Sequence, residues 1–311
     1  MPSDGPIGGI DYPGTYQAFR DWFADDDACL DYLERLRWPD GFVCPVCDAR
    51  DAWRVAGHRW MCTKCGRKTS VTAGTIFHRS RTPMSTWFAA VWFLTSQKNG
   101  ISALALQSQL GFGSYETAWA WLHKLRRAMV RPDRERLSGV VELDETFVGG
   151  LAPGKDGAGT DKVPVQIAVE RLGPKKLGRV RFAIAPSPGS LELVEFALRE
   201  IEPGSTVRTD GARMLRRLVD YGYRHEPVIV YDAEEKDSVL TGVHLVASLL
   251  KRWLAGSLQY SVTKKHLAYY LDEYAFRFNR RTSSTRGMLF YRLLQQAVMT
   301  DPRPLAELVA K

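Results

Sequence analysis

The sequence has no long apolar run, and this absence limits where the protein can work. Its most hydrophobic stretch, Trp87–Leu94, is far shorter than the roughly eighteen residues that a membrane-spanning helix needs. The first residues, Met-Pro-Ser-Asp-Gly-Pro, lack the basic and then apolar pattern of a secretory signal peptide. Apolar residues make up 45% of the 311, which is ordinary for a globular chain. We therefore expect two or three domains, a cytoplasmic, nucleoid-associated location and no membrane partner.

Acidic residues are scarce in two parts of the chain. The net charge is +8, but residues 251–311 hold 11 Lys and Arg against 4 Asp and Glu, a balance of +7. Residues 41–85 hold 8 against 2, a balance of +6, whereas residues 1–40 hold 3 against 9, a balance of −6. Two separate basic blocks suggest a polyanion that touches two parts of the molecule, although a basic face can also serve solubility alone.

Cysteine is rare, and four of the 5 cysteines form two C-x-x-C pairs. Cys44 and Cys47 are followed, after fourteen residues, by Cys62 and Cys65. Two such pairs around a short β-rich stretch are typical of a zinc ribbon, and disulfides are disfavoured in the cytosol. Four thiolates leave no open position on the ion, so we expect structural Zn²⁺. Cys29 lies in a helical pattern and is expected in the core.

The segment after the ribbon predicts a helix-turn-helix. Helical spacing of apolar residues over Ser102–Leu110 and Tyr115–Val130 is interrupted by the glycine-containing turn Gly111–Ser114. A plain helical hairpin is the alternative, but the preceding basic ribbon favours double-stranded DNA as the partner. The residues expected to contact DNA are Arg67 and Lys68 in the ribbon, Lys124, Arg126 and Arg127 on the second helix, and Arg252, Arg277, Arg280 and Arg281 near the C-terminus.

From Gly139 onward, alternating apolar runs predict strands. Three consecutive strands are followed by helices alternating with strands, which is the order of a ribonuclease-H-like α/β domain. We expect flexible or turn-like loops at Gly149–Lys162 and Tyr231–Ser238. The expected strands are Val140–Val148, Val163–Glu170, Arg179–Ala185, Thr206–Thr209 and Glu226–Tyr231, and the expected helices are Leu191–Ile201, Gly211–Tyr221 and Val243–Ala255.

The first of these strands carries an acid where a buried residue is expected. Asp144 lies among β-forming residues, and an unpaired buried charge is costly unless a metal ion or a partner compensates it. We therefore propose Asp144 as a metal ligand. The alternative is that Glu142, Asp144 and Glu145 are solvated residues of an edge strand. In a regular strand Glu145 faces away from Asp144 and does not share its site.

Three further residues can complete a metal site with Asp144. Asp210 directly follows a strand, at a tip that opens to solvent. His244 and Lys251 are seven residues apart on one helix, so they share a face, two turns apart. His244 would then bind the metal, and Lys251 a phosphate. Individually, Asp210 can instead be a helix cap, His244 an ordinary helix-start residue, and Lys251 a surface lysine.

Several segments together resemble one family. The chain is similar to DDE-type insertion-sequence transposases, in the zinc-ribbon bacterial group related to eukaryotic Merlin elements, the insertion sequence 1595 family. The resemblance implies a ribonuclease-H-like catalytic domain, divalent metal, and cutting and joining of transposon-end DNA, with Asp144 and Asp210 as the first two acidic ligands. The segments that carry the resemblance are Leu36–Cys47, Thr72–Phe77, Leu143–Gly150, Arg208–Gly211 and Tyr270–Arg281.

The third ligand departs from the pattern of the superfamily, which has Glu seven residues before Lys or Arg. Here His244 precedes Lys251 by seven residues, and imidazole suits Mn²⁺ better than Mg²⁺. Asp272 and Glu273 are alternative acids, in a helix that is expected mainly to face DNA or to pack. The resemblance also implies at least a homodimer on two DNA ends. The alternative functions are a DNA-binding regulator with an inactive catalytic domain and a nuclease that does not join strands.

The expected fold class is therefore a multidomain α+β protein. We expect an N-terminal helical segment over residues 1–40, a zinc ribbon over 41–80 and a helix-turn-helix-like region over 81–135. A ribonuclease-H-like α/β catalytic domain is expected over residues 139–300, followed by a tail over 301–311.

Overall fold

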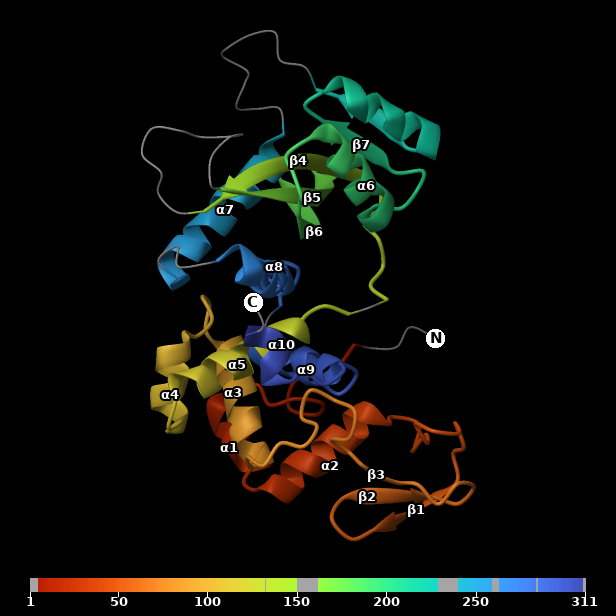
Figure 1. Ribbon diagram of the computed structural model, residues 1–311, viewed down its shortest axis with the longest axis vertical. Helices are drawn as coiled ribbons and strands as arrows, with labels where there is room; N and C mark the ends of the chain where they lie inside the picture. Colours follow the sequence, from red (N-terminus) through yellow and green to blue (C-terminus); the bar gives the residue numbers. More distant parts are fainter. Residues whose placement is uncertain are drawn as a thin grey trace. The chain divides into compact units, whose positions relative to one another are not determined.

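The computed structural model describes residues 5–131, 133–149, 162–228, 240–258, 263–283 and 285–309. The chain divides into two compact units (Figure 1). The first combines residues 1–131 with 282–311, and the second is the continuous segment 132–281. The second unit thus ends before residue 300, where the sequence predicted the end of the catalytic domain.

Helices and a small sheet form the first unit. The expected helical stretch Tyr16–Arg37 is two helices, because the Asp25 side chain accepts a hydrogen bond from the Ala28 amide and starts the second one. The helices are α1 (Tyr16–Trp22), α2 (Asp26–Arg37), α3 (Met84–Ser96), α4 (Ala103–Leu110), α5 (Tyr115–Arg127), α9 (Arg286–Ala297) and α10 (Leu305–Val309).

Helix α9 belongs to the core of this unit. Phe290 is fully buried, and its ring lies 5.5 Å from that of Phe19 and 5.7 Å from that of Phe88, centroid to centroid. A Cβ atom on Gly287 would lie 1.9 Å from the carbonyl oxygen of Pro13, so only glycine allows this close approach. The C-terminal helix therefore completes the N-terminal helical core, which explains why residues 282–300 do not belong to the sheet unit.

Helices α4 and α5 form the predicted helical pair. Ser102 and Ser114 cap their N-termini by accepting hydrogen bonds from backbone amides. Gly111 ends α4 in the left-handed conformation, with φ at 66°, which glycine adopts without a steric penalty. Trp121 of α5 stacks on Trp87 of α3 at 3.4 Å, so the pair is held against the helical core.

The predicted ribbon is a three-stranded antiparallel sheet, in the order β1 (Ala52–Val55), β2 (Arg59–Cys62), β3 (Lys68–Ser70). The sulfur atoms of Cys44 and Cys65 are 3.6 Å apart, as are those of Cys47 and Cys62, and all four lie within 4.8 Å of one another. These distances are too long for disulfides, whose S–S length is about 2.05 Å. Tetrahedral zinc, with Zn–S of about 2.3 Å, separates its sulfur ligands by roughly 3.8 Å. The four thiols therefore fit a structural zinc ion.

The second unit is a mixed five-stranded sheet in the order β6-β5-β4-β7-β8. Strands β4, β5 and β6 are antiparallel neighbours, whereas β7 and β8 run parallel to β4. This is the expected ribonuclease-H-like arrangement of three strands in sequence followed by parallel strands. The strands are β4 (Val140–Val148), β5 (Val163–Gly173), β6 (Lys176–Ile184), β7 (Thr206–Thr209) and β8 (Arg224–Pro227).

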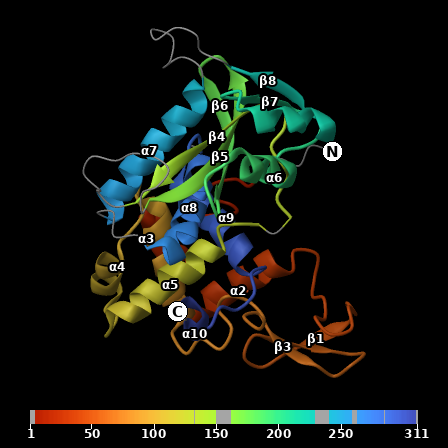
Figure 2. The same cartoon turned by 45° about the horizontal axis from the view of Figure 1, so that its top comes forward.

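Helices cover both faces of this sheet (Figure 2). On one face, α7 (Thr241–Leu258) and α8 (Lys264–Phe278) pack against residues of β5 and β6. On the other, α6 (Ser190–Glu200) and η1 (Arg213–Tyr221) pack over β4 and β7. The expected helix Gly211–Tyr221 is the 3₁₀ helix η1 and begins two residues later.

Two predicted loops fall largely or wholly outside the described residues. These are Gly149–Lys162, of which only the two end residues are described, and Tyr231–Ser238. The expected strand Glu226–Tyr231 is found at Arg224–Pro227, and the description stops at Val228. In the described parts of the chain, no helix is both long and apolar enough to span a bilayer.

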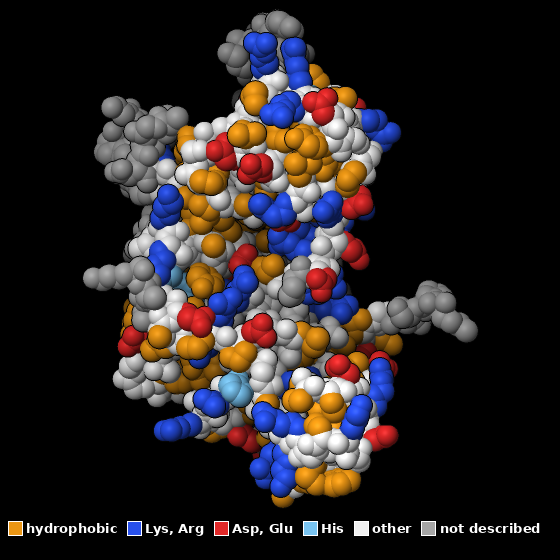
Figure 3. All heavy atoms as spheres, turned by 45° about the vertical axis from the view of Figure 1, so that its right-hand side comes forward, with side chains coloured by type: hydrophobic (Ala, Val, Ile, Leu, Met, Phe, Trp, Pro, Cys, Tyr) orange, Lys and Arg blue, Asp and Glu red, His pale blue; other side chains and the backbone are white. Residues whose placement is uncertain are grey.

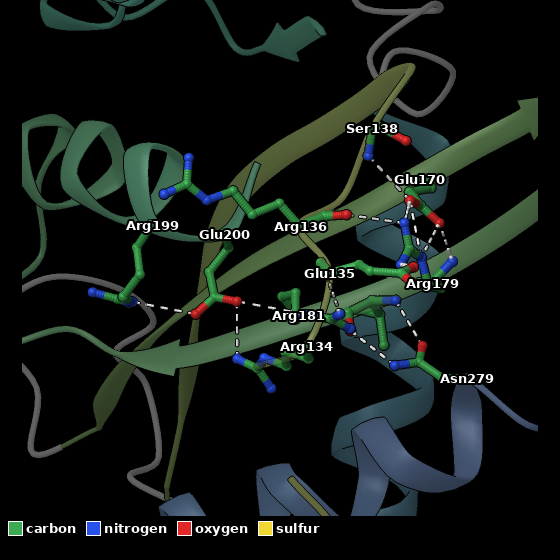
Figure 4. A network of polar contacts seen from close by, with 11 residues as sticks. Arg134, Glu135, Arg136, Ser138, Glu170, Arg179, Arg181, Arg199, Glu200 and Asn279 are labelled. Atoms are coloured by element: carbon green, nitrogen blue, oxygen red, sulfur yellow. Dashed lines mark hydrogen bonds and ion pairs between the residues drawn. The ribbon is translucent and has the colours of Figure 1, made fainter. Parts of the chain in front are cut away.

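A buried charge network fixes the segment that leads into β4 (Figure 4). Glu170 on β5 accepts hydrogen bonds from the Arg179 guanidinium and from the Ser138 amide. Glu200 on α6 pairs with Arg134 at 2.9 Å and with Arg181 at 3.5 Å. Because Glu170, Arg181 and Glu200 are each less than 9% exposed, these pairs compensate charges that would otherwise be costly to bury. The network therefore holds the chain at Ser138, two residues before β4 begins.

Glu170→Gln tests this network through pH. Burial opposes ionisation, but hydrogen bonds from Arg179 and Ser138 overcome it and hold the pKa of Glu170 below its ordinary value. The ionised Glu170 carboxylate therefore contributes its full stabilisation above the ordinary pKa of glutamate. This stabilisation is lost as the pH falls through the lowered pKa of Glu170 in the folded protein. We expect Glu170→Gln to reduce the free energy of unfolding at pH 7 by about 2 kcal/mol. The difference from wild type should shrink on acidification in urea titrations; a constant difference would contradict the assignment.

Cys62→Ser tests the metal that holds the ribbon. Removing one of four thiolates should lower zinc content from one ion per chain to well below half, because three ligands do not close a structural site. Cys29→Ala is the matched control, since Cys29 is equally buried but lies in α2, outside the cluster. Atomic absorption on both purified variants gives the measurement. Full zinc content in Cys62→Ser would contradict the assignment of the four cysteines as the ligands of a structural zinc ion.

Candidate functional site

The acids of β4 lie on a central strand. β4 pairs with β5 on one side and with β7 on the other. The edge-strand alternative is therefore wrong. Glu142 is 1% exposed and Asp144 is partly buried, so neither is a freely solvated surface residue. Glu145 accepts a hydrogen bond from the Gly189 amide, just before α6, and so lies on the other face, as strand alternation predicts.

The strand register brings Asp210 beside Asp144. β4 and β7 pair in parallel with a constant offset, Val140 with Thr206 and Glu142 with Arg208, which is 206 − 140 = 66 residues. Asp210 follows Asp144 by the same 66 residues, so continuing the register by two positions places it opposite Asp144 on the same face. Its Oδ1 also accepts a hydrogen bond from the Ala212 amide, so a local capping role accompanies this placement.

His244 on α7 contacts Asp144 directly. Its Nε2 lies 3.4 Å from Oδ2 of Asp144, and its side chain is 52% exposed against 22% for the aspartate. Helix α7 crosses the sheet at β4 and β5, so a residue in its first turns lies over the strand that carries Asp144. The imidazole of His244 and the carboxylate of Asp144 therefore lie in contact between α7 and the sheet, and the imidazole is the more exposed of the two groups.

The environment of Asp144 favours a bound cation. Burial raises the pKa of the Asp144 carboxyl, and the negative charges of Asp210 and Glu145 raise it further. The Glu145 amide, 2.8 Å from Oδ1, and His244 act in the opposite direction without cancelling the rise. A partly buried carboxylate among other acids is stabilised when a metal ion supplies positive charge. The donor set of Asp144, Asp210 and His244 thus fits a divalent metal.

The three candidate ligands, Asp144, Asp210 and His244, are not gathered as tightly as the ribbon cysteines. Among the described residues, their ligand atoms do not all lie within 4.8 Å of one another. A pair of ions about 3.5–4 Å apart spreads its ligands over a wider space than a single ion does. Lys251 follows His244 by two turns of α7, about 10 Å along its axis, and is half-buried.

The alternative acids on α8 lie elsewhere. Helix α8 packs against β6, at the far edge of the sheet from β7. Glu273 is 1% exposed and pairs with Arg277 at 2.8 Å. Asp272, its neighbour, is half-buried on the same helix. The positions of these two acids therefore favour His244 over both as the third ligand.

The expected DNA-contacting residues differ in exposure. Arg67, Lys68 and Arg127 are exposed, and the surface view shows Lys and Arg side chains in several groups (Figure 3). Lys124 is half-buried, and burial lowers the pKa of its ammonium group. Arg126 is only 3% exposed, so the expectation that it contacts DNA is corrected: its side chain lies inside the helical core.

Near the C-terminus the basic block packs on its own helix. Arg277 is held by Glu273, which again corrects the expected DNA contact. Arg280 lies 4.0 Å above the Phe276 ring, and Arg281 lies 4.0 Å above the Phe278 ring and donates to the carbonyl of Gly178. Arg252 on α7 is exposed. The arginines at positions 277, 280 and 281 therefore make contacts within their own unit, although Arg281 remains exposed.

Sequence reasoning missed the role of Glu142. It lies two residues before Asp144 on the same face, and its Oε2 accepts a hydrogen bond from the Val243 amide at 2.9 Å. The alternation of the strand was a usable signal, because it placed Glu142 in the interior. The contact with α7, 101 residues away in sequence, had no signal in the pattern.

Two protein families match parts of the chain. The family described as "ISXO2-like transposase domain" matches residues 136–279, which include Asp144, Asp210, His244 and Lys251. The family described as "Transposase zinc-ribbon domain" matches residues 24–68, which include all four clustered cysteines.

A relative in Halobacterium salinarum is described as an uncharacterized protein in transposable element ISH50. It is 28% identical over 280 residues, covering 82% of this chain and 91% of the relative. The two domain matches occur in the order that the ribbon and the sheet unit take along the chain. With its four-cysteine ribbon and its mixed α/β sheet, the chain carries the zinc-ribbon and transposase domains of the insertion sequence 1595 family.

Proposed function

We propose that the protein binds transposon-end DNA and catalyses metal-dependent strand cleavage and strand transfer. The observation that carries this proposal is the match in register between Asp144 on β4 and Asp210, which directly follows the parallel strand β7, with His244 in contact with Asp144. All three lie within the part of the chain that matches the transposase domain. Carboxylates placed in this way are suited to hold divalent ions for in-line displacement at a phosphodiester.

Each protein group has a distinct role in this proposal. Asp144 and Asp210 hold the metal and keep it at one face of the sheet. His244 supplies a neutral nitrogen ligand, which favours Mn²⁺ over Mg²⁺ relative to a carboxylate. Lys251 contacts a phosphate of the bound strand. When bound, two divalent ions would supply Lewis acidity toward the attacking and the leaving oxygen.

DNA binding is proposed for the exposed basic residues outside the sheet as well. Arg67 and Lys68 on the ribbon and Arg127 at the end of α5 present charge to solvent. Arg252 extends the basic surface along α7, one residue beyond Lys251. Phosphate contacts of this kind predict binding that weakens steeply with salt. Two DNA ends in one complex would require at least a dimer.

A cutting and joining assay tests the activity. Purified wild-type chain is incubated with DNA carrying the terminal repeats of its element, a target plasmid, and Mg²⁺ or Mn²⁺. Metal-dependent nicking followed by joining supports the transposase. Nicking without joining indicates a nuclease. Binding without nicking indicates a regulator with an inactive catalytic domain, an alternative that is kept because His244 replaces the usual glutamate at the third position.

Asp144→Asn and Asp210→Asn should each reduce cutting by about two orders of magnitude or more, because an amide binds divalent ions far more weakly than a carboxylate. Binding to end DNA should persist in both. Asp220→Asn is the matched control, since Asp220 is an exposed acid of η1 in the same unit. Gel-shift and nicking assays on the same preparations make the measurement. Loss of DNA binding in parallel would assign both residues a structural role.

His244→Glu tests the third ligand. A carboxylate at this position restores the charge that Mg²⁺ prefers, so cutting with Mg²⁺ should be retained or increased relative to cutting with Mn²⁺. The measured quantity is the ratio of the two nicking rates in wild type and variant. An unchanged ratio would contradict metal binding at position 244.

A further inference from the structure

Glu142 joins the sheet to the first turn of α7. Its Oε2 accepts a hydrogen bond from the Val243 amide at 2.9 Å. Val243 is the third residue of the helix, where backbone amides have no partner within the helix. A carboxylate at this end also interacts favourably with the helix dipole. Glu142 therefore acts as a cap supplied from the sheet.

Two arginines compensate the buried charge of Glu142. Arg171 Nε on β5 lies 3.3 Å from Oε1, and Arg208 Nη1 on β7 lies 3.9 Å from the same oxygen. Arg171 also reaches Thr241, the first residue of α7, with Nη1 3.5 Å from its hydroxyl oxygen. Three adjacent strands thus supply the charges that hold the start of one helix.

Gly242 makes this approach possible. A Cβ atom there would lie 2.7 Å from Oε2 of Glu142, 3.0 Å from Leu177 and 3.1 Å from Arg171. The Glu142 and Arg171 atoms are already held by the contacts above, so they cannot move aside without losing a hydrogen bond or an ion pair. A larger residue would displace the first turn of α7 from the sheet.

This displacement bears directly on the metal site, because His244 is the next residue after Val243. We propose that Glu142 and Gly242 form a seat for α7 that positions His244 over Asp144. The inference rests on the proposed metal-dependent function. Glu142 and Gly242 are thus positioning residues, which act on the site through His244.

Gly242→Ala is the direct test, with Gly256→Ala as its matched control. Gly256 lies in the same helix, and a Cβ atom there meets nothing within 4 Å. We use the full-length chain and titrate Mn²⁺ alone, following free Mn²⁺ by electron paramagnetic resonance. Binding that Asp144→Asn abolishes is assigned to the site. Gly242→Ala should raise the Kd for this Mn²⁺ at least about tenfold, the effect typical of a lost supporting contact. Gly256→Ala should leave it unchanged.

A double-mutant cycle separates positioning from general stability. If Gly242 acts through His244, Gly242→Ala should add no further loss of Mn²⁺ affinity in a His244→Ala background. A purely structural role would lower the thermal midpoint and leave Mn²⁺ affinity of the folded chain unchanged. Wild-type affinity in Gly242→Ala, or additive losses in the cycle, overturns the proposal.

Two further measurements keep the test decisive. Should Gly242→Ala not fold, Glu142→Gln replaces it, since a neutral amide oxygen accepts more weakly from the Val243 amide than a carboxylate does and carries no charge toward Arg171. Unchanged Mn²⁺ affinity in Glu142→Gln would then contradict the proposed positioning role of Glu142. The imidazole NMR signal of His244 is identified by its absence from the spectrum of His244→Ala. Its chemical shift should change in Gly242→Ala and stay the same in Gly256→Ala. The chemical shift of His244 tests whether Gly242 positions the imidazole, and this test does not require Mn²⁺ binding. If wild type bound no Mn²⁺, the proposed metal-dependent function would be rejected, and the shift would still test the positioning role.

Discussion

The burial of acidic side chains on β4 is the constraint on which the sheet unit depends. Each acid is accommodated by a different partner. Glu142 is compensated by Arg171, Arg208 and the start of α7. Glu145 is on the other face, bonded to the amide of Gly189. Asp144 shares its face with Asp210 and is left with a raised pKa, because burial and neighbouring acids outweigh what the Glu145 amide and His244 provide. Protein groups therefore compensate two of these acids, and the third, Asp144, is the proposed metal ligand.

Histidine at the third position changes the electrostatics of this site. Two carboxylates and a neutral imidazole carry one negative charge fewer than three carboxylates, so they compensate a pair of divalent ions less completely. His244 lies in the first turn of α7, so the position of that turn determines the 3.4 Å contact between His244 and Asp144. The position of His244 therefore depends on the placement of α7, whereas Asp144 lies on β4 and Asp210 directly follows β7, two strands that are paired in parallel.

The division into two units separates the structural metal from the acidic site. The four-cysteine ribbon and α4–α5 belong to the helical unit, which residues 282–311 complete through α9. The mixed sheet and its acids belong to the other unit. Basic residues occur in both, but exposure rather than position along the chain decides which of them can meet a polyanion. Arg126 and Arg277 are covered by their own units, whereas Arg67 and Arg252 face solvent.

The sequence by itself determined the features that rest on local spacing. Two C-x-x-C pairs specified the four-cysteine cluster, and period-two alternation located β4 and β7 at their observed bounds. Tertiary structure alone decided which distant groups meet. The partners of Glu142, the burial of Arg126 and the return of α9 to the N-terminal core join residues far apart in sequence. Such contacts follow from how faces pack in three dimensions, and a one-dimensional pattern of apolar and charged residues does not encode that choice.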